Sequence, residues 1–171
     1  LTAGTPIDGM FIELPLALQG SRQAVFGGPQ EGVKVVQGDK RAHVLVDGSD
    51  HYAFNDGGKV TEEGLCKNAK PHPDGLGWLD LSDKGKGMTV GLRRFWQQWP
   101  KAVEARPDGS VRLHLWANVD ETVHTVPADL DMSMEALHSD VVEGRQNLFP
   151  GSSKTHDVVF AFHGPDAGPT A

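Results

Sequence analysis

Alternation of apolar and polar residues is the clearest pattern at the start of the chain. In residues 10–18, MFIELPLAL, every second residue from Met10 to Leu18 is apolar, and Glu13 and Pro15 lie on the other side. This period of two predicts a half-buried β-strand. Because Pro15 cannot donate a hydrogen bond to a neighbouring strand, we expect this strand at the edge of a sheet.

Further short strands are predicted between clusters of Gly, Pro, Asn and Asp. The candidates lie at 33–37, 41–47, 52–54, 76–81, 87–93, 101–106, 110–116 and 155–163, with weaker ones near 121–126 and 131–137. The last main candidate, Thr155–His163, has the β-branched and aromatic content of a core strand. We expect a loop at 60–75, and a single helical turn over 92–99 that Pro100 ends.

The strand predicted at 110–116 has two chemically different faces. Its odd-numbered positions from 111 to 115 are apolar and are expected to face the core, which places Arg112, His114 and Trp116 on the opposite face. These three side chains could form the floor of a ligand groove. Alternatively, they are the solvated side of an antiparallel sheet.

The fold class follows from the number of strands and turns. The 171 residues include 21 Gly and 11 Pro, which favours many short strands over long helices. Eight or more short strands without a convincing helix predict an all-β fold: an antiparallel, two-sheet β-sandwich, supersandwich-like, with long loops and little helix. We expect a single domain over 1–164 and a disordered tail at 165–171.

Charge is spread unevenly along the chain. The formal net charge of −7 argues against nucleic acid as a partner, whereas the window from Lys84 to Arg112 holds seven bases and two acids. A basic surface on an acidic body could hold an anionic ligand. The alternative is that these bases form salt bridges or lie on a solvated face. No apolar run approaches the ~20 residues of a membrane span, so we expect no membrane partner.

No motif predicts a metal or cofactor site. The single cysteine, Cys66, excludes an internal disulfide and a zinc site built on thiolates, and no HExxH spacing occurs. A calcium turn at Asp47, Ser49 and Asp50 is an open alternative, although it lacks the glycine and glutamate of an EF-hand loop. We therefore expect no cofactor, with structural calcium left open.

The densest chemical feature is LRRFWQQWPK, residues 92–101. Sugars are recognised by flat aromatic faces and by planar hydrogen-bonding groups, and forked guanidinium donors suit a uronate carboxylate. On this interpretation Arg93, Arg94 and Lys101 contact a carboxylate, and Trp96 and Trp99 contact the sugar ring. The alternative is that the aromatic residues wedge between the sheets as part of the core.

A second candidate lies in SSKTHD, residues 152–157, just before the last strand. Lys154 and His156 could act as a charge neutraliser and a base, or they could cap and pin the strand. Their spacing alone does not decide between these two interpretations.

Three stretches carry a resemblance to a known family. They are GWLDLSDKGKGMTVGLRRFWQQWPKAVE (77–104), RLHLW (112–116) and SSKTHDVVFAFHG (152–164). Together they resemble the central β-sandwich module of exo-rhamnogalacturonan lyase-like (YetA-like) polysaccharide lyases. The resemblance implies a barrel-like N-terminal domain and a helical toroid in the full-length enzyme. This chain has no toroid, and its LWANVD differs from the proline-and-acid stretch that the family has after the tryptophan.

The sequence therefore leads to one main hypothesis and two alternatives. The main hypothesis is a carbohydrate-active module of a polysaccharide lyase that acts on uronate-containing, rhamnogalacturonan-type polysaccharide such as pectin. The first alternative is a stand-alone module that binds acidic polysaccharide without cleaving it. The second is a structural domain in which the aromatic motif belongs only to the core. Whether the chain catalyses on its own is left open.

The hypothesis assigns a role to each candidate residue. His114 and His156 are the acid/base candidates; the substrate-binding candidates are Arg93, Arg94, Trp96, Trp99, Lys101, Arg112, Trp116 and Lys154. The expected partners are acidic polysaccharide and other domains of a longer enzyme, because Leu1 looks like a processed end or a domain boundary. Such a substrate implies a secreted or periplasmic protein.

Overall fold

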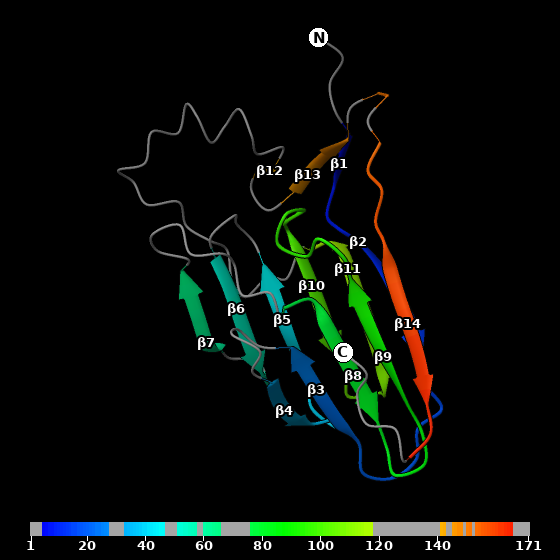
Figure 1. The fold of residues 1–171 in the computed structure, drawn as a ribbon. Helices are drawn as coiled ribbons and strands as arrows, with labels where there is room; N and C mark the ends of the chain where they lie inside the picture. Colours follow the sequence, from blue (N-terminus) through cyan, green and yellow to red (C-terminus); the bar gives the residue numbers. More distant parts are fainter. Residues whose placement is uncertain are drawn as a thin grey trace.

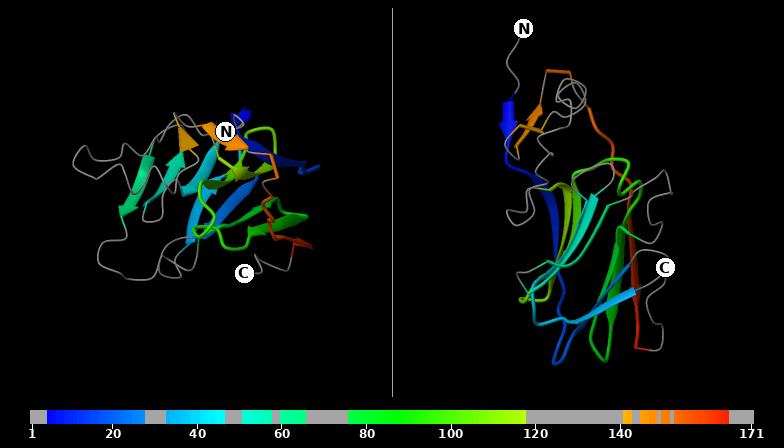
Figure 2. Two further views of the ribbon diagram at one scale, coloured as in Figure 1. Left: turned by 90° about the horizontal axis from the view of Figure 1, so that it is seen from above. Right: turned by 90° about the vertical axis from the view of Figure 1, so that its left-hand side faces the viewer.

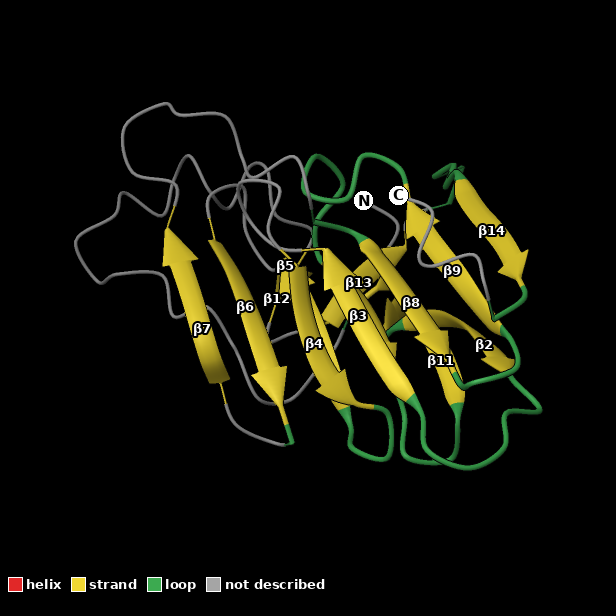
Figure 3. Ribbon diagram, turned by 60° about the horizontal axis from the view of Figure 1, so that its bottom comes forward, coloured by secondary structure: helices red, strands yellow, loops and turns green. Residues whose placement is uncertain are grey.

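The structure is a computed structural model that describes residues 5–27, 33–46, 51–57, 60–65, 76–117, 141–142, 145–148, 150–151 and 153–165. Within these ranges it contains strands and turns and no helix (Figure 3). Two antiparallel sheets pack face to face (Figures 1 and 2). The chain is thus an all-β sandwich, as the sequence predicts.

The larger sheet has six strands and the smaller has five. In spatial order the larger consists of β2 (Met10–Pro15), β11 (Ser110–Trp116), β10 (Lys101–Ala105), β5 (Ala42–Val46), β6 (His51–Asp56) and β7 (Val60–Leu65). The smaller consists of β14 (Val158–His163), β9 (Gly87–Leu92), β8 (Trp78–Ser82), β3 (Gln23–Gly27) and β4 (Val33–Gln37).

A third, three-stranded sheet lies beyond one end of the sandwich (Figure 2, right). Its strands are β1 (Thr5–Ile7), β13 (Arg145–Leu148) and β12 (Val141–Val142), in the order β1-β13-β12. It joins a segment near the start of the chain to one far along it, because Thr5 pairs with Leu148.

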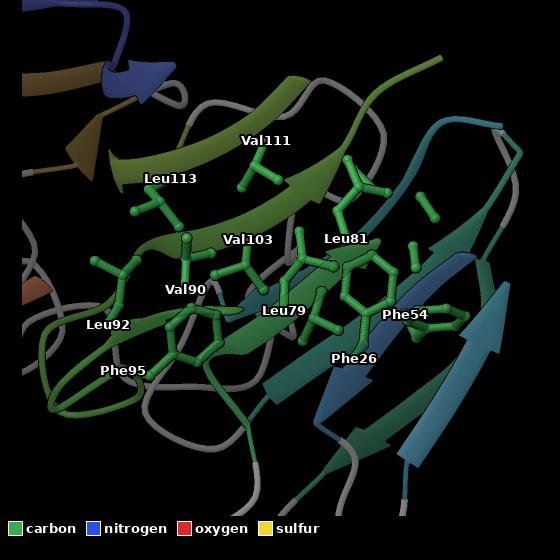
Figure 4. Packing of buried hydrophobic residues seen from close by; sticks show 14 of the residues in the cluster. Phe26, Phe54, Leu79, Leu81, Val90, Leu92, Phe95, Val103, Val111 and Leu113 are labelled. Carbon is green, nitrogen blue, oxygen red and sulfur yellow. The ribbon is translucent and has the colours of Figure 1, made fainter. Parts of the chain in front are cut away.

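The core lies between the inner faces of the two large sheets (Figure 4). Apolar side chains from both sheets meet there, and Phe26 packs edge-on against Phe54 with ring centroids 5.4 Å apart. Ile12 and Leu14 of β2 pack against this cluster, whereas Phe11 and Glu13 are exposed. Each large side chain buried in this way contributes about 2 kcal/mol by its removal from water.

Most predicted strands are confirmed. β2 pairs with β11 alone and forms an edge, as Pro15 predicts, and β10 and β11 form the hairpin expected across Pro107–Gly109. The helical turn expected at 92–99 occurs as turn structure over 93–98, where the Gln98 amide donates to the Arg94 carbonyl at 3.2 Å.

Two strand predictions are wrong. Residues 60–65, expected in a loop, form β7, which pairs with β6 and ends the larger sheet. β14, expected in the core, pairs only with β9 at the end of the smaller sheet. In this edge strand Phe160 and Phe162 are exposed by 42% and 76%.

The two-faced prediction for 110–116 holds as far as His114 and then fails. The register of β11 against β2 shifts between His114, which pairs with Phe11, and Trp116, which pairs with Met10. Paired residues lie on the same face of a sheet, so this bulge moves Trp116 from the face of Arg112 and His114 to the side of Met10 and Ile12. The three side chains therefore do not share one groove floor.

The turn at 93–98 is anchored in the core by Phe95. Phe95 is buried and lies between the sheets beside Leu92 and Val90 (Figure 4). Its side chain packs so closely on Gly77 (φ +101) that a Cβ there would lie 2.6 Å from the Phe95 Cβ. A glycine at 77 is therefore required both by the backbone conformation and by the close approach of Phe95.

Several predictions lie outside the described residues: the weak strands near 121–126 and 131–137, the calcium turn at 47–50, Cys66 and the tail from 166. None of the described elements is a helix of the length and apolarity needed to cross a membrane.

Candidate functional site

Three segments that are distant in sequence meet at one end of the sandwich. They are the turn at 93–98 with the start of β10, the end of β11, and residues 153–157 leading into β14. The Arg93 amide donates to the Asp157 carbonyl at 3.0 Å, and the Ala117 amide donates to the Pro100 carbonyl at 3.1 Å. These main-chain bonds fix the segments relative to each other. They unite the central and the late motifs of the family resemblance.

Lys101 lies at the centre of this arrangement. It is fully buried, and its Nζ donates to Gln98 Oε1 at 2.8 Å and to the Arg93 carbonyl at 3.3 Å. Burial and, to a lesser extent, the Lys154 charge lower the pKa of Lys101 to about 8, against the opposing effect of the Asp157 carboxylate. Both hydrogen-bond acceptors are neutral. Among the residues that the structure describes, no carboxylate forms an ion pair with the Lys101 ammonium.

His156 is the second member of the site. Both of its ring nitrogens are shielded from solvent and have no hydrogen-bond partner in the described part of the chain. Burial and the charges of Lys101 and Lys154 lower the pKa of His156 to about 4. The imidazole is therefore neutral at pH 7 and is able to accept a proton.

Lys154 completes the site from the solvent side. It is exposed, and its Nζ donates to the Gln98 carbonyl at 3.4 Å. The same ammonium lies 5.3 Å from the centroid of the Trp116 ring, and His156 meets Trp116 edge-on at a centroid distance of 6.4 Å. We call Lys101, Lys154 and His156 the basic cluster.

The basic cluster has the chemistry of an anion site. Two ammonium groups and an unpartnered imidazole converge, and Asp157 is the nearby carboxylate, beyond ion-pair distance. Buried charge without a counterion is costly and is relieved when an anion binds. A ligand carboxylate would supply the missing negative charge. It would accept hydrogen bonds from Lys154 and from the more deeply placed Lys101 or His156.

The predicted aromatic contacts differ from an open sugar platform. Trp116 is only 9% exposed, and the Lys154 ammonium lies over its ring. Trp96 and Trp99 are half-buried and pack against the core. None of the three indoles therefore offers a fully exposed face to a sugar ring.

Arg93 and Arg94 are exposed on the turn beside the basic cluster. Arg94 has a left-handed backbone conformation (φ 51), which is uncommon for a residue other than glycine, asparagine or aspartate. The contribution of Arg93 to the site is made by its main chain, whose N–H and C=O bond to Asp157 and Lys101 respectively. Both guanidinium groups remain available to a ligand at the rim.

The two other candidates, Arg112 and His114, belong to a separate network. His114 Nε2 lies 2.7 Å from Glu104 Oε2, and Arg112 forms an ion pair with Glu13 and lies 4.0 Å from the Phe11 ring centroid. Arg41 also bonds Glu104, at 2.8 Å. These contacts engage His114 Nε2 and two nitrogens of Arg112, whereas no hydrogen bond within the described residues engages His156, so the geometry favours His156 as the acid/base candidate.

Sequence reasoning missed two parts of this arrangement. Gln98, which contacts both lysines, lies in the aromatic segment but was not among the candidate residues. The other is Glu104, whose partners come from three strands or strand ends. Its position opposite Arg112 in the hairpin is the only signal in the sequence pattern that could have revealed it.

Comparison with known proteins does not assign the chain to a family, because neither a family model nor a curated protein matches it. The resemblance of 77–104, 112–116 and 152–164 to a lyase family therefore stays a prediction.

Proposed function

We propose that the chain is a carbohydrate-active module of a polysaccharide lyase that acts on uronate-containing, rhamnogalacturonan-type polysaccharide. The observation that carries this proposal is the basic cluster, in which two lysines without a described carboxylate partner flank a neutral, unpartnered histidine. The motif resemblance supports the same function, because the cluster is built from its central and late stretches. The proposed site contains no metal ligand set; within the described residues no three His, Cys, Asp or Glu side chains are grouped to hold a metal.

The proposed chemistry is β-elimination beside a uronate. Lys154, with Lys101 behind it, neutralises the sugar carboxylate and so makes the C5 proton more acidic. Neutral His156 accepts that proton, the C5–H electron pair forms the C4=C5 double bond, and the C4–O bond breaks. The leaving oxygen takes a proton from solvent or from the newly formed imidazolium. No redox partner is required.

The second candidate is a module that binds acidic polysaccharide without cleaving it. The observation that favours it is the shielding of both His156 ring nitrogens from solvent. A base must reach the C5 proton, so His156 would have to be uncovered for catalysis, whereas binding at Lys154 needs no such change. Either activity places the proposed substrate outside the cell, which supports a secreted or periplasmic location and a role beside other domains.

The test is to incubate the folded chain with rhamnogalacturonan and to follow the ultraviolet absorbance of unsaturated uronate. A lyase gives a steady rise that is lost in His156→Gln and Lys154→Met but kept in Lys84→Met. Lys84 is a suitable control because it is exposed in the turn before β9, at the opposite end of that strand from the basic cluster. Binding of rhamnogalacturonan without a rise supports the second candidate, and neither binding nor a rise refutes both.

A further inference from the structure

Gln98 contacts both lysines of the basic cluster, although the sequence did not mark it as a candidate residue. Its side-chain oxygen accepts from Lys101 Nζ at 2.8 Å, and its side-chain nitrogen donates to the Thr155 carbonyl at 3.2 Å. Its main-chain oxygen accepts from Lys154 Nζ at 3.4 Å. One residue thus connects the start of β10 with the segment that carries Lys154 and His156.

The chemical type of this side chain is as informative as its contacts. A primary amide is a good acceptor for an ammonium but carries no charge. A glutamate in the same place would form a buried ion pair with Lys101 and cancel the charge that the site presents. The other acceptor of Lys101, the Arg93 carbonyl, is also neutral. Two of the three ammonium protons of Lys101 thus have acceptors, and neither acceptor neutralises the charge.

We propose that Gln98 is the positioning residue of the basic cluster: its neutral side chain holds Lys101 against the segment at 153–157 and leaves the lysine charge free for an anionic ligand. This inference rests on the proposed function only for the identity of the anion, a sugar carboxylate. The geometric and electrostatic part stands without it.

The charged groups around Lys101 determine how a substitution of Gln98 should change the pKa values in the basic cluster. Lys101 is flanked by Lys154 and His156 from the late segment and by Asp157, whose carboxylate opposes the effect of Lys154. Arg93 and Arg94 are exposed on the same turn as Gln98. A new carboxylate at 98 would be in direct contact with Lys101, whereas the others act from farther away.

The experiment compares Gln98→Glu, Gln98→Met and Gln97→Glu in the full chain. Gln97 is the matched control, because it is exposed and adjacent and receives the same charge away from Lys101. Carbon-detected NMR titrations follow the lysine Cε and the histidine ring signals, and calorimetry measures the affinity for trigalacturonate.

Gln98→Glu is expected to raise the pKa of Lys101 and that of His156 by roughly 1 unit each, since an opposite charge now compensates the site. It should also weaken trigalacturonate binding about tenfold. Gln98→Met should lower the pKa of Lys101, because the charged form loses an acceptor. Gln97→Glu should shift both values by much less.

A residue that merely supports the turn would give a different result. The folded variants would then lose thermal stability while the pKa values of Lys101 and His156 stayed in place, and this result would overturn the inference. Gln98→Met provides an independent test if Gln98→Glu does not fold. Expected pKa shifts without trigalacturonate binding by the wild type would refute the proposed function and leave the role of Gln98 intact.

Discussion

His114 and Glu104 form a buried pair on the face of the larger sheet that points away from the core, with Nε2 and Oε2 2.7 Å apart. Burial by itself would raise the pKa of Glu104, but hydrogen bonds from His114 and Arg41, together with their charges, lower it to about 2. Glu104 is fully buried, so its charge depends on these partners. The pair stabilises the sheet. Because His114 is engaged by Glu104, it is not favoured as the acid/base residue.

Glu104→Gln should lower the free energy of unfolding at pH 7 by about 3 kcal/mol, because it removes the buried carboxylate charge that Arg41 and His114 contact. Since the pKa of Glu104 is lower in the folded protein than its usual 4.5, its stabilisation is present above pH 4.5 and is lost as the pH falls towards about 2. Urea unfolding at several pH values should show the difference between wild type and variant shrinking in that window. A difference that does not change with pH would contradict this account.

His156 should titrate near pH 4, well below the usual value of 6.5, because burial and two lysine charges disfavour the imidazolium. Lys154→Met removes one of these charges and should raise the pKa of His156 by roughly half a unit. NMR titration of the ring signals measures both, with Lys84→Met as the control. A wild-type pKa close to 6.5 would show that the basic cluster is open to solvent.

Lys101→Met should be no less stable than the wild type at pH 7, because an apolar side chain of similar length replaces a buried charge without a counterion. The pKa of Lys101 is lowered from 10.5 to about 8, so the unfolded chain holds a proton that the folded chain has released between these values. Wild-type stability should therefore rise by up to about 3 kcal/mol relative to the variant as the pH increases through that window. Thermal unfolding measured from pH 7 to 10 tests this; a large loss of stability in Lys101→Met at pH 7 would mean that the charge is well compensated.

Asp80 supports the other sheet through two hydrogen bonds. It is fully buried, and its Oδ2 accepts from Thr89 Oγ1 and lies 2.7 Å from His163 Nε2. Asp80→Asn should cost about 2 kcal/mol, whereas Phe162→Ser, on the exposed side of β14, should cost less than about 0.5 kcal/mol. Chemical denaturation of the two variants gives the comparison.

The contribution of the Asp80–His163 pair to stability falls as the pH rises, whereas that of Glu104 grows. Burial lowers the pKa of His163, but the hydrogen bonds to the Gly164 carbonyl and Asp80 outweigh it and raise the pKa above 6.5. Its stabilisation is therefore complete below pH 6.5 and declines as the pH rises through the raised value. The stability difference between wild type and Asp80→Asn should be larger at pH 6 than at pH 9, and equal values would argue against a charged pair.

The alternation of apolar residues, together with the many Gly and Pro turns, predicted the sandwich, since both signals are local to the backbone. It identified β2 as an edge through Pro15 and both strands of the β10–β11 hairpin. It could not place β14 at an edge, because strand order depends on pairing between distant segments. Phe162 is exposed in the structure, although an aromatic residue in such a segment is typical of a core strand.

The site was predicted in its residue types but not in its assembly. Lys101, Lys154 and His156 were candidates from two separate motifs, and only the fold brings them together. The bulge after His114 separates Trp116 from Arg112, which no alternation pattern reveals because it depends on the register against β2. The sequence did not reveal the role of Gln98 either, because the role of an amide side chain depends on its hydrogen-bond partners, which only the fold defines.

Calorimetry with trigalacturonate and its fully methyl-esterified form measures whether the basic cluster binds a sugar carboxylate. We expect the acid to bind and the ester to bind at least about tenfold more weakly. Lys154→Met should lose most of this preference, and Lys84→Met should keep it. Equal binding of acid and ester, or a preference for the acid that Lys154→Met leaves unchanged, would contradict the proposed carboxylate binding.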